Sequence, residues 1–235
     1  MAKFRVLVAD PAWEFGDNLT MSDVKRGSSS NYDTLTIADL KQLPVQEICT
    51  EDAILALWCP SALLSEGLGV MKAWGFRQTQ THIWVKTKKI PLRSLIRELA
   101  FAFKQLGPKL CSKATRADFA GEIKEIISKF RPDSVLAFGM GRLFRQTHEV
   151  ALVGVRGKIY DKLKDKSQRS VHFHPSTKHS TKPEALQDML EKMFPKAKCL
   201  ELFARRDRPG WTCVGLECPS TLGEDIRISL DRLKS

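Results

Sequence analysis

A carboxylate, a proline and an aromatic residue follow the first apolar run of the chain. The run Phe4–Ala9 leads directly into Asp10, Pro11, Ala12 and Trp13. An ionised carboxylate only accepts hydrogen bonds and proline fixes the backbone, so Asp10 and the Pro11 carbonyl can accept both hydrogens of an exocyclic amine. An exposed indole at Trp13 would add a stacking surface that contributes about 1–3 kcal/mol per base. These residues predict a site for an amine-bearing base; alternatively, Asp10 and Pro11 end a strand and Trp13 fills the core.

Alternating strands and helices are expected to position this motif. Apolar runs predict strands over residues 4–9, 53–58, 81–87, 149–155, 199–203 and 211–215. Helices are expected after Thr36 and Ser61, each acting as an N-cap, and after Pro183, while Gly75 ends the second helix. The alternation favours an α/β fold, in which a sheet lies between helices and ligands bind at the carboxyl ends of its strands.

One segment, residues 88–134, does not fit this alternation. Apolar residues recur at helical spacing in two runs, Leu92, Leu95, Ile96, Leu99 and Phe103, then Phe119, Ile123, Ile126, Ile127 and Phe130. We expect two basic amphipathic helices, joined through Gly107 and Pro108 and inserted into a single domain that spans residues 1–235. The insertion is a candidate target-recognition region for nucleic acid; the alternative is a packing subdomain that binds no ligand.

The positive charge of the chain is concentrated in two stretches. The net charge is +11. Residues 88–134 carry eleven Lys and Arg against five acids, residues 156–198 carry the same numbers, and the remainder carries 16 basic and 17 acidic residues. Clustered charge of this kind is typical of proteins that bind a phosphate backbone, and the alternative is a solubilising surface.

Composition narrows the class of protein. The chain has 235 residues, of which 43% are hydrophobic and 28% charged, as in ordinary globular domains. No apolar run reaches the roughly 18 to 20 residues of a membrane span, and no secretory signal is evident, so we expect an intracellular protein. Six cysteines occur without a C-x-x-C pair and are expected to be reduced and mostly buried: Cys49, Cys59, Cys111, Cys199, Cys213 and Cys218.

Nine short blocks, taken in order along the chain, resemble one enzyme family. They are residues 9–13, 32–35, 57–58, 74–76, 83–87, 148–157, 179–184, 201–205 and 209–211. The family is that of the N6-adenine methyltransferases related to the catalytic subunit of the eukaryotic mRNA methyltransferase, and the chain is most similar to its bacterial and phage DNA-modifying members. The resemblance covers nearly all of the chain except residues 88–134.

The resemblance implies a Rossmann-like methyltransferase fold in permuted order, with the catalytic motif before the cofactor motif. It implies S-adenosylmethionine as the methyl donor and Asp10, Pro11, Ala12 and Trp13 as catalytic residues. The donor would be bound by Asp10, Ser180, Lys182, Phe203, Arg205, Leu216 and Glu217, with Lys182 facing its carboxylate and Glu217 its ribose. The substrate would be bound by Tyr32 and Lys86, which lie in these blocks. Arg142 and Arg145 are added as substrate-binding candidates because they precede a strand at the expected open end of the sheet, where they could contact phosphates.

The chain departs from the family pattern at three places. Ala12 replaces the usual second proline of the catalytic motif, and Leu216 replaces an asparagine near the ribose. The chain also begins too close to Asp10 to supply an N-terminal contact to the donor's adenine, so a later loop is expected to supply it. Because Asp10 and Trp13 are both retained, we expect an active enzyme.

Other polar clusters are assigned no catalytic role. His172, His174 and His179 lie close together, but no carboxylate or cysteine accompanies them at ligand spacing, so no metal is expected. Arg206 and Arg208 are further candidates for phosphate contacts.

The predicted function is transfer of a methyl group from S-adenosylmethionine to the N6 amine of adenine in DNA. The alternatives are the same reaction on RNA, or a non-catalytic relative that binds nucleic acid. The expected partner is nucleic acid, with DNA favoured over RNA and no membrane, in a cytoplasmic protein of a bacterial or phage-infected cell. A homodimer, or a complex with a partner subunit, is a further expectation.

Overall fold

A computed structural model describes residues 3–14, 35–90, 92–106, 113–129, 132–139, 143–176 and 181–234. The chain divides into two compact units, one of Met1–Trp84, His148–His172 and Pro183–Ser235, the other of Val85–Thr147 and Phe173–Lys182. The predicted insertion, residues 88–134, lies wholly in the second unit.

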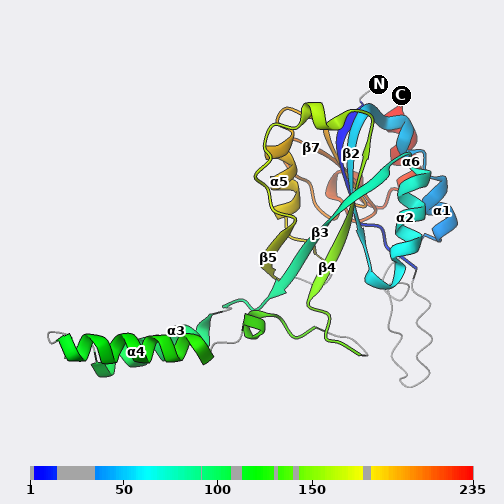
Figure 1. Ribbon diagram of the computed structural model, residues 1–235. Helices are drawn as coiled ribbons and strands as arrows, with labels where there is room; N and C mark the ends of the chain where they lie inside the picture. The colour runs from blue at the N-terminus through cyan, green and yellow to red at the C-terminus, as the bar shows by residue number, and fades with distance from the viewer. Residues whose placement is uncertain are drawn as a thin grey trace, which may run out of the picture. The chain divides into compact units, whose positions relative to one another are not determined.

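Seven strands form one mixed sheet, which confirms the predicted α/β class (Figure 1). They are β1 (Phe4–Ala9), β2 (Cys49–Cys59), β3 (Arg77–Thr87), β4 (His148–Arg156), β5 (Val171–Pro175), β6 (Cys199–Leu202) and β7 (Trp211–Val214). The strand order is β5-β3-β4-β2-β1-β6-β7. Strand β1 is parallel to both β2 and β6, β6 is parallel to β7, and β4 runs antiparallel to β2.

Four α-helices of the first unit cover the two faces of the sheet. Figure 1 shows α1 (Ile37–Gln42), α2 (Leu64–Ala73) and α6 (Ile226–Lys234) on one side and α5 (Ala185–Met193) on the other. Successive residues of β1 point to opposite faces: Leu7 belongs to the core beneath α1, α2 and α6, whereas Val8 belongs to the core beneath α5. Strand β1 is therefore buried on both faces, as its continuous apolar sequence predicts.

The predicted helix starts are confirmed in one case and wrong in another. Thr36 caps α1 in a capping box: its hydroxyl accepts the Asp39 N–H, and the Asp39 carboxylate accepts the Thr36 N–H. Ser61 does not cap α2, because a short 3-10 helix over Ser61–Leu63 precedes it and α2 begins at Leu64 without a side-chain cap. Gly75 follows α2 with a φ of 81°, as expected of a residue that ends a helix.

Further short 3-10 helices link the main elements. They are η2 (Val45–Ile48), η3 (Ser61–Leu63), η5 (Pro132–Val135), η6 (Ile159–Lys162) and η7 (Pro219–Thr221). None of the helices in the described part of the chain has the length and apolarity that a membrane span requires.

The strand order creates a crevice between β1 and β6. The chain leaves β1 toward β2 on one side, and leaves β6 toward β7 on the other side. Where neighbouring parallel strands send their connections in opposite directions, their carboxyl ends leave an open crevice, the usual ligand site of α/β sheets. The predicted catalytic and donor motifs follow these two strands, so the topology brings together residues nearly two hundred positions apart.

The second unit contains the predicted pair of helices, α3 (Arg93–Leu106) and α4 (Lys113–Lys129). Phe103 of α3 packs edge to face on Phe119 of α4, with ring centroids 4.8 Å apart, so the two helices form a hairpin. The residues expected to join them, Gly107 and Pro108, lie outside the described residues. Helix α3 carries three basic residues and one acidic residue, and α4 carries four basic and three acidic residues, so both have a net positive charge, in agreement with the expectation.

The cysteines described by the structure are free thiols. Cys49, Cys59, Cys199, Cys213 and Cys218 are all buried, as expected, and Cys111 lies outside the described residues. Burial raises the pKa of Cys49 and of Cys59 to about 12, so both thiols stay protonated at neutral pH.

Candidate functional site

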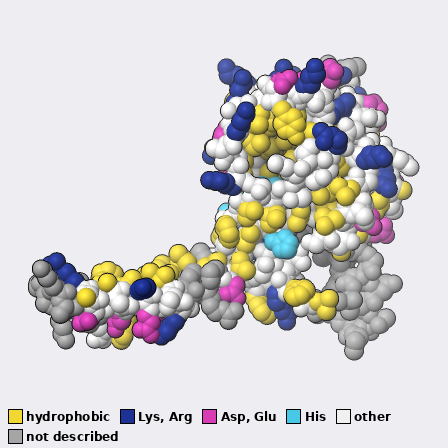
Figure 2. Space-filling view, viewed as in Figure 1, with side chains coloured by type: hydrophobic (Ala, Val, Ile, Leu, Met, Phe, Trp, Pro, Cys, Tyr) yellow, Lys and Arg dark blue, Asp and Glu magenta, His cyan; other side chains and the backbone are white. Residues whose placement is uncertain are grey.

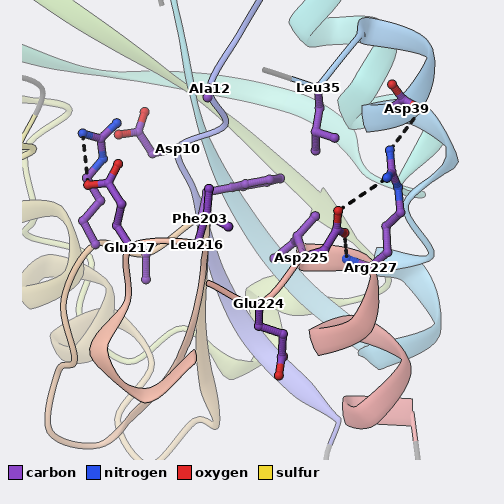
Figure 3. A pocket seen from close by; sticks show the side chains of 13 residues that line it. Asp10, Ala12, Leu35, Asp39, Phe203, Leu216, Glu217, Glu224, Asp225 and Arg227 are labelled. Atoms are coloured by element: carbon purple, nitrogen blue, oxygen red, sulfur yellow. Dashed lines mark hydrogen bonds and ion pairs between the residues drawn. The ribbon is translucent and has the colours of Figure 1, made fainter. Parts of the chain in front are cut away.

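A pocket of about 330 Å³ opens at the carboxyl ends of β1 and β6 (Figure 3). The strand ends contribute Asp10, Ala12, Phe203, Arg205, Leu216 and Glu217, and the facing wall contributes Leu35, Asp39, Glu224, Asp225 and Arg227. Figure 3 shows Asp10 and Glu217 at one end of this pocket, Asp39 and Arg227 at the other, and the Phe203 ring between them. The structure thus brings together five predicted donor residues: Asp10, Phe203, Arg205, Leu216 and Glu217.

Asp10 takes its place in the pocket from the register of two parallel strands. Ala9 of β1 pairs with Leu202 of β6, and the Asp10 N–H donates to the Leu202 carbonyl over 3.3 Å. Asp10 therefore leaves the sheet beside Phe203, the first residue after β6. Its carboxylate is partly buried in the wall of the pocket.

The next residues form a tight turn that lowers the Pro11 carbonyl's capacity to bind an amine. The Trp13 N–H donates to the Pro11 carbonyl over 2.9 Å. A carbonyl oxygen has two lone pairs, so one acceptor position of Pro11 is used inside the turn and one is left for a substrate. Ala12, at the centre of the turn, lines the pocket.

The prediction of an exposed indole at Trp13 is wrong. Its side chain is 3% exposed and belongs to the core, and its indole N–H donates to the Trp58 carbonyl over 2.9 Å. A large aromatic ring gains most when it is buried with a partner for its polar atom, and the turn after Asp10 delivers it to the core rather than to the pocket. The core-filling alternative describes Trp13, while Asp10 lies in the pocket.

The loop after β6 is shaped by a close backbone approach instead of a glycine-rich turn. Phe203 has a φ of 60°, a left-handed conformation that is uncommon for residues other than glycine. The Ala204 N–H donates to the Val214 carbonyl over 3.0 Å. A Cβ on Gly215 would lie 2.4 Å from the Ala204 carbonyl oxygen, so only glycine lets the ends of β6 and β7 approach this closely.

Arg205 and Glu217 face each other across the mouth of these two strand ends. The guanidinium Nη1 of Arg205 lies 3.9 Å from the Glu217 carboxylate, and the two side chains are 25% and 41% exposed. At this distance and exposure the pair contributes little stability. A ligand that displaces this ion pair therefore gives up little stability.

The prediction that Arg208 contacts phosphates is wrong. Its side chain is only 10% exposed and forms ion pairs with Glu184, Asp188 and Glu191 from α5 and the turn before it. Burial by itself lowers the pKa of Arg208, but the hydrogen bonds that its guanidinium donates to Asp188 and Glu191 outweigh this effect and hold the pKa above its usual value. Arg208 fixes the loop after β6 onto α5.

Two further contacts strengthen this attachment of the loop to α5. The Arg206 Nε lies 3.0 Å from Glu184, so Arg206 is also paired with α5's first turn. The Trp211 indole N–H donates to Glu191 over 2.6 Å. Sequence reasoning missed this cluster because its acids and its arginines lie about twenty residues apart, with no local pattern that pairs them.

The far wall of the pocket was also not predicted. Arg227 of α6 bridges two carboxylates, with Nη2 3.2 Å from Asp39 and Nη1 3.5 Å from Asp225. The Arg227 N–H also donates to Asp225 over 2.7 Å, which makes Asp225 the cap of α6. The hydrogen bond from the Thr36 hydroxyl, then Arg227, lowers the pKa of Asp39. These contacts join the starts of α1 and α6.

Two predicted substrate residues lie in the second unit, at the end of β3. The Lys86 N–H donates to the Thr147 carbonyl over 2.7 Å, and the Lys86 carbonyl accepts the Ala137 N–H over 2.8 Å. The Arg145 guanidinium lies 4.6 Å from the centre of the Phe138 ring. Lys182 is half-buried in the same unit. Tyr32, Arg142 and Ser180 lie outside the described residues.

The histidines considered for a metal site are used differently. His172 is buried and stacks on His82, with His82 Nε2 2.7 Å from His172 Nδ1. Burial lowers the pKa of His82 to about 4, so this ring is neutral near pH 7. His174 contacts the Pro175 carbonyl, and His179 lies outside the described residues. Within the described ranges, no three His, Cys, Asp or Glu side chains are grouped as metal ligands.

Taken together, these observations define an α/β protein with a pocket at a strand switch point and an acid at the end of the first strand. The sequence profile of the MT-A70 family matches residues 4–105 and 125–217, so the chain belongs to the MT-A70 family of methyltransferases. The unmatched residues within the match, 106–124, run from the last residue of α3 into α4, and the match ends before α6.

Individual relatives span the chain nearly completely. The type II methyltransferase M.MunI of Mycoplasma sp is 26% identical over 232 residues, covering 92% of this chain and 78% of the relative. An N(6)-adenosine-methyltransferase MT-A70-like protein of Arabidopsis thaliana is 23% identical, and the catalytic subunit METTL3 of Homo sapiens is 24% identical, each over 92% of this chain. The chain spans only 24% and 28% of these two eukaryotic relatives.

Proposed function

We propose that this chain transfers a methyl group from S-adenosylmethionine to the N6 amine of adenine in DNA. The observation that carries the proposal is the placement of Asp10 in one pocket with Phe203, Arg205 and Glu217. A catalytic acid and a set of donor-binding residues must adjoin if a methyl group is to pass between two bound molecules. DNA is favoured because M.MunI, a type II methyltransferase, matches over most of its own length.

The residues of the pocket suit the proposed donor. A volume of about 330 Å³ falls at the lower end of the range for small-molecule sites. Carboxylates at Asp10 and Glu217 favour a cationic sulfonium compound, and Glu217 can accept both hydroxyl hydrogens of a ribose. The Phe203 ring and the Leu216 side chain supply an apolar wall. We retain Lys182 and Ser180 as the residues proposed to bind the donor's carboxylate.

We propose that the start of α6 contacts the donor's adenine. Glu224, Asp225 and Arg227 line the pocket opposite the strand ends. This wall is joined to α1 by the Arg227 bridge, so it is held in place before a ligand binds.

The catalytic work of the chain is to hold the amine and complete its deprotonation. When bound, S-adenosylmethionine supplies an electrophilic methyl group. The Asp10 carboxylate and the free lone pair of the Pro11 carbonyl accept the two amine hydrogens, which directs the nitrogen lone pair toward the donor. A nitrogen–carbon bond forms as the sulfur–carbon bond breaks, and the excess amine proton leaves through Asp10 to water.

The target base must reach this pocket from a nucleic acid. In a duplex, the adenine has to leave the base stack before its amine becomes accessible. Because Trp13 is buried, it does not stack on the base in this conformation, and the base face must be covered by other residues. We assign Lys86, Arg145, Arg142 and Tyr32 to the substrate, and the 88–134 insertion to recognition of the target sequence.

RNA is the second candidate substrate. The match to human METTL3, an N(6)-adenosine-methyltransferase catalytic subunit, extends over 92% of this chain. The pocket chemistry is the same for either nucleic acid, since the reacting amine is identical. The two proposals therefore differ only in how the strand is presented.

A single assay separates the candidates. The protein is incubated with methyl-labelled S-adenosylmethionine and with duplex DNA, heat-denatured DNA or RNA, and the digested nucleosides are analysed. N6-methyladenine in DNA is the expected product, and label confined to RNA favours the second candidate. Binding of nucleic acid with no label on any adenine would identify a non-catalytic relative.

A further inference from the structure

The segment before β4 is held as a closed loop on the end of β3. Backbone hydrogen bonds join Lys86 to Thr147 and to Ala137, and the Lys88 N–H donates to the Val135 carbonyl over 3.0 Å. A Cβ on Gly139 would lie 1.9 Å from the Gln146 carbonyl oxygen. The two sides of the loop therefore meet at Gly139, where only a glycine fits, and the loop is anchored at its base.

Beyond this base, the loop exposes three large apolar side chains. Phe138 is 81% exposed, Leu143 93% and Phe144 87%. Single exposed hydrophobic residues are common on protein surfaces, but three within seven positions mark an interaction site. Arg145 lies beside them with its guanidinium over the Phe138 ring, 4.6 Å from its centre. We call Phe138, Leu143, Phe144 and Arg145 the aromatic tip.

The charge around the aromatic tip indicates the class of partner. The two chain segments that form its base and its tip, residues 85–90 and 135–147, contain five Lys and Arg and no Asp or Glu. A second copy of this chain would bring two such loops, both positive, against each other, which is unfavourable. A polyanion gains from the same charges through release of counterions. The combination of phenyl rings and cations fits unpaired or unstacked bases on a phosphate backbone.

We propose that the aromatic tip contacts the bases of the nucleic-acid substrate, with Phe138 and Phe144 against base faces and Arg145 toward the backbone. This rests on the proposed function, because it names the residues that meet the target strand. Apolar side chains that enter between base steps unstack them partly and bend the duplex. The tip therefore lowers the cost of extruding the adenine, which the buried Trp13 does not do.

The test compares two variants that remove exposed phenylalanine rings from the same unit. The double variant Phe138→Ala/Phe144→Ala is expected to bind duplex DNA about tenfold more weakly than the wild-type chain, measured by fluorescence anisotropy at fixed salt. The matched control is Phe173→Ala, which removes a phenyl ring that is 64% exposed on β5, and its affinity is expected to stay unchanged. Calorimetric binding of S-adenosylmethionine is expected to be equal in all three proteins, which shows that the double variant is folded.

Other partners give different results. If the double variant binds and methylates DNA as the wild type does, the proposal is overturned. It is also overturned if DNA affinity is unchanged while light scattering shows that the variant turns a dimer into a monomer, or if vesicles of anionic lipid lose binding instead of DNA. A wild-type protein that binds DNA but methylates no nucleic acid contradicts the proposed function alone, because the tip is read from binding.

Discussion

The loop after β6 and the aromatic tip are both irregular segments beside β-strands, and they are built in opposite ways. The loop is fastened to α5 by the nearly buried Arg208 and its three carboxylates. The tip is anchored at its base by backbone hydrogen bonds and leaves Phe138 81% and Phe144 87% exposed. Figure 2 shows that hydrophobic side chains, as well as Lys and Arg side chains, reach the viewed surface.

This difference suits the two proposed ligands, a small methyl donor and a nucleic acid. A small donor gains little energy per contact, so a loop that is already ordered spares it the entropy cost of ordering. A nucleic acid offers many contacts and charge neutralisation, so its binding residues can stay exposed until it arrives. We infer a donor site that is formed in advance and a substrate site that the substrate completes.

The largest effect is expected from replacing Asp10, the acid that the proposed donor and substrate sites share. Asp10→Ala removes the group proposed to accept the amine hydrogen, so methyl transfer should fall at least about 100-fold. Binding of S-adenosylmethionine should be kept in part, because Phe203, Arg205 and Glu217 are unchanged. The measurements are label incorporation into DNA and calorimetry with the donor. Turnover at the wild-type rate would refute the assignment of Asp10.

The next largest effect should come from loosening the donor loop. Arg208→Gln removes the positive charge from three carboxylates and frees the loop from α5, so the Kd for S-adenosylmethionine should rise about tenfold, and stability should fall by about 2 kcal/mol. The kcat at saturating donor should change much less than the KM, because the reacting groups are untouched. Calorimetry, steady-state kinetics and urea unfolding supply the three values.

Two variants distinguish positioning from a general loss of charge. Arg208→Lys keeps the charge but not the forked geometry, so it should recover only part of the donor affinity. Arg77→Gln removes an exposed arginine at the start of β3 and should change neither value. If Arg208→Gln unfolds more easily yet binds the donor normally, Arg208 has a structural role only.

The sequence predicted what local patterns encode. Apolar runs located six of the seven strands but missed β5, whose short sequence Val171–Pro175 alternates histidines with apolar residues. The order of the motifs placed Asp10, Phe203 and Glu217 at neighbouring strand ends. Contacts between residues distant in the sequence were not predicted. No local pattern indicates that Trp13 points into the core, or that Arg208 pairs with acids about twenty positions earlier. Residue type alone does not distinguish an arginine at the surface from one that is buried among carboxylates.

The same reasoning explains why the aromatic tip was missed. Phe138, Leu143 and Phe144 resemble core residues in a sequence, because large apolar side chains are usually buried. Only the fold shows that the pairing of the end of β3 with residues 135–147 leaves no core for them to enter. Lys86 was predicted nearby from the family resemblance and Arg145 from its place before a strand, both without their aromatic neighbours.

A smaller effect is expected where the donor loop approaches β7. Gly215→Ala places a Cβ 2.4 Å from the Ala204 carbonyl oxygen, so the backbone must shift, at a cost of roughly 1–3 kcal/mol. Because the shift moves Phe203, donor affinity should fall a few-fold while affinity for DNA stays constant. Gly121→Ala is the control, since a Cβ there meets nothing within 4 Å. Equal donor affinity in both variants would show that the loop tolerates displacement.

The smallest expected effect tests the buried side of the donor strand. Burial raises the pKa of Glu201 on β6, although the hydrogen bond from Gln187 opposes this. A carboxyl whose pKa is raised by folding destabilises the protein when it is ionised. Its contribution to stability is therefore full at pH values below the unfolded pKa, near 4.3, and is lost as the pH rises through the folded pKa. Glu201→Gln should therefore stabilise the protein by about 1 kcal/mol at pH 7.5. The gain should disappear at pH 4, measured by urea unfolding at both pH values; an equal gain at both would show that ionisation of Glu201 carries no penalty.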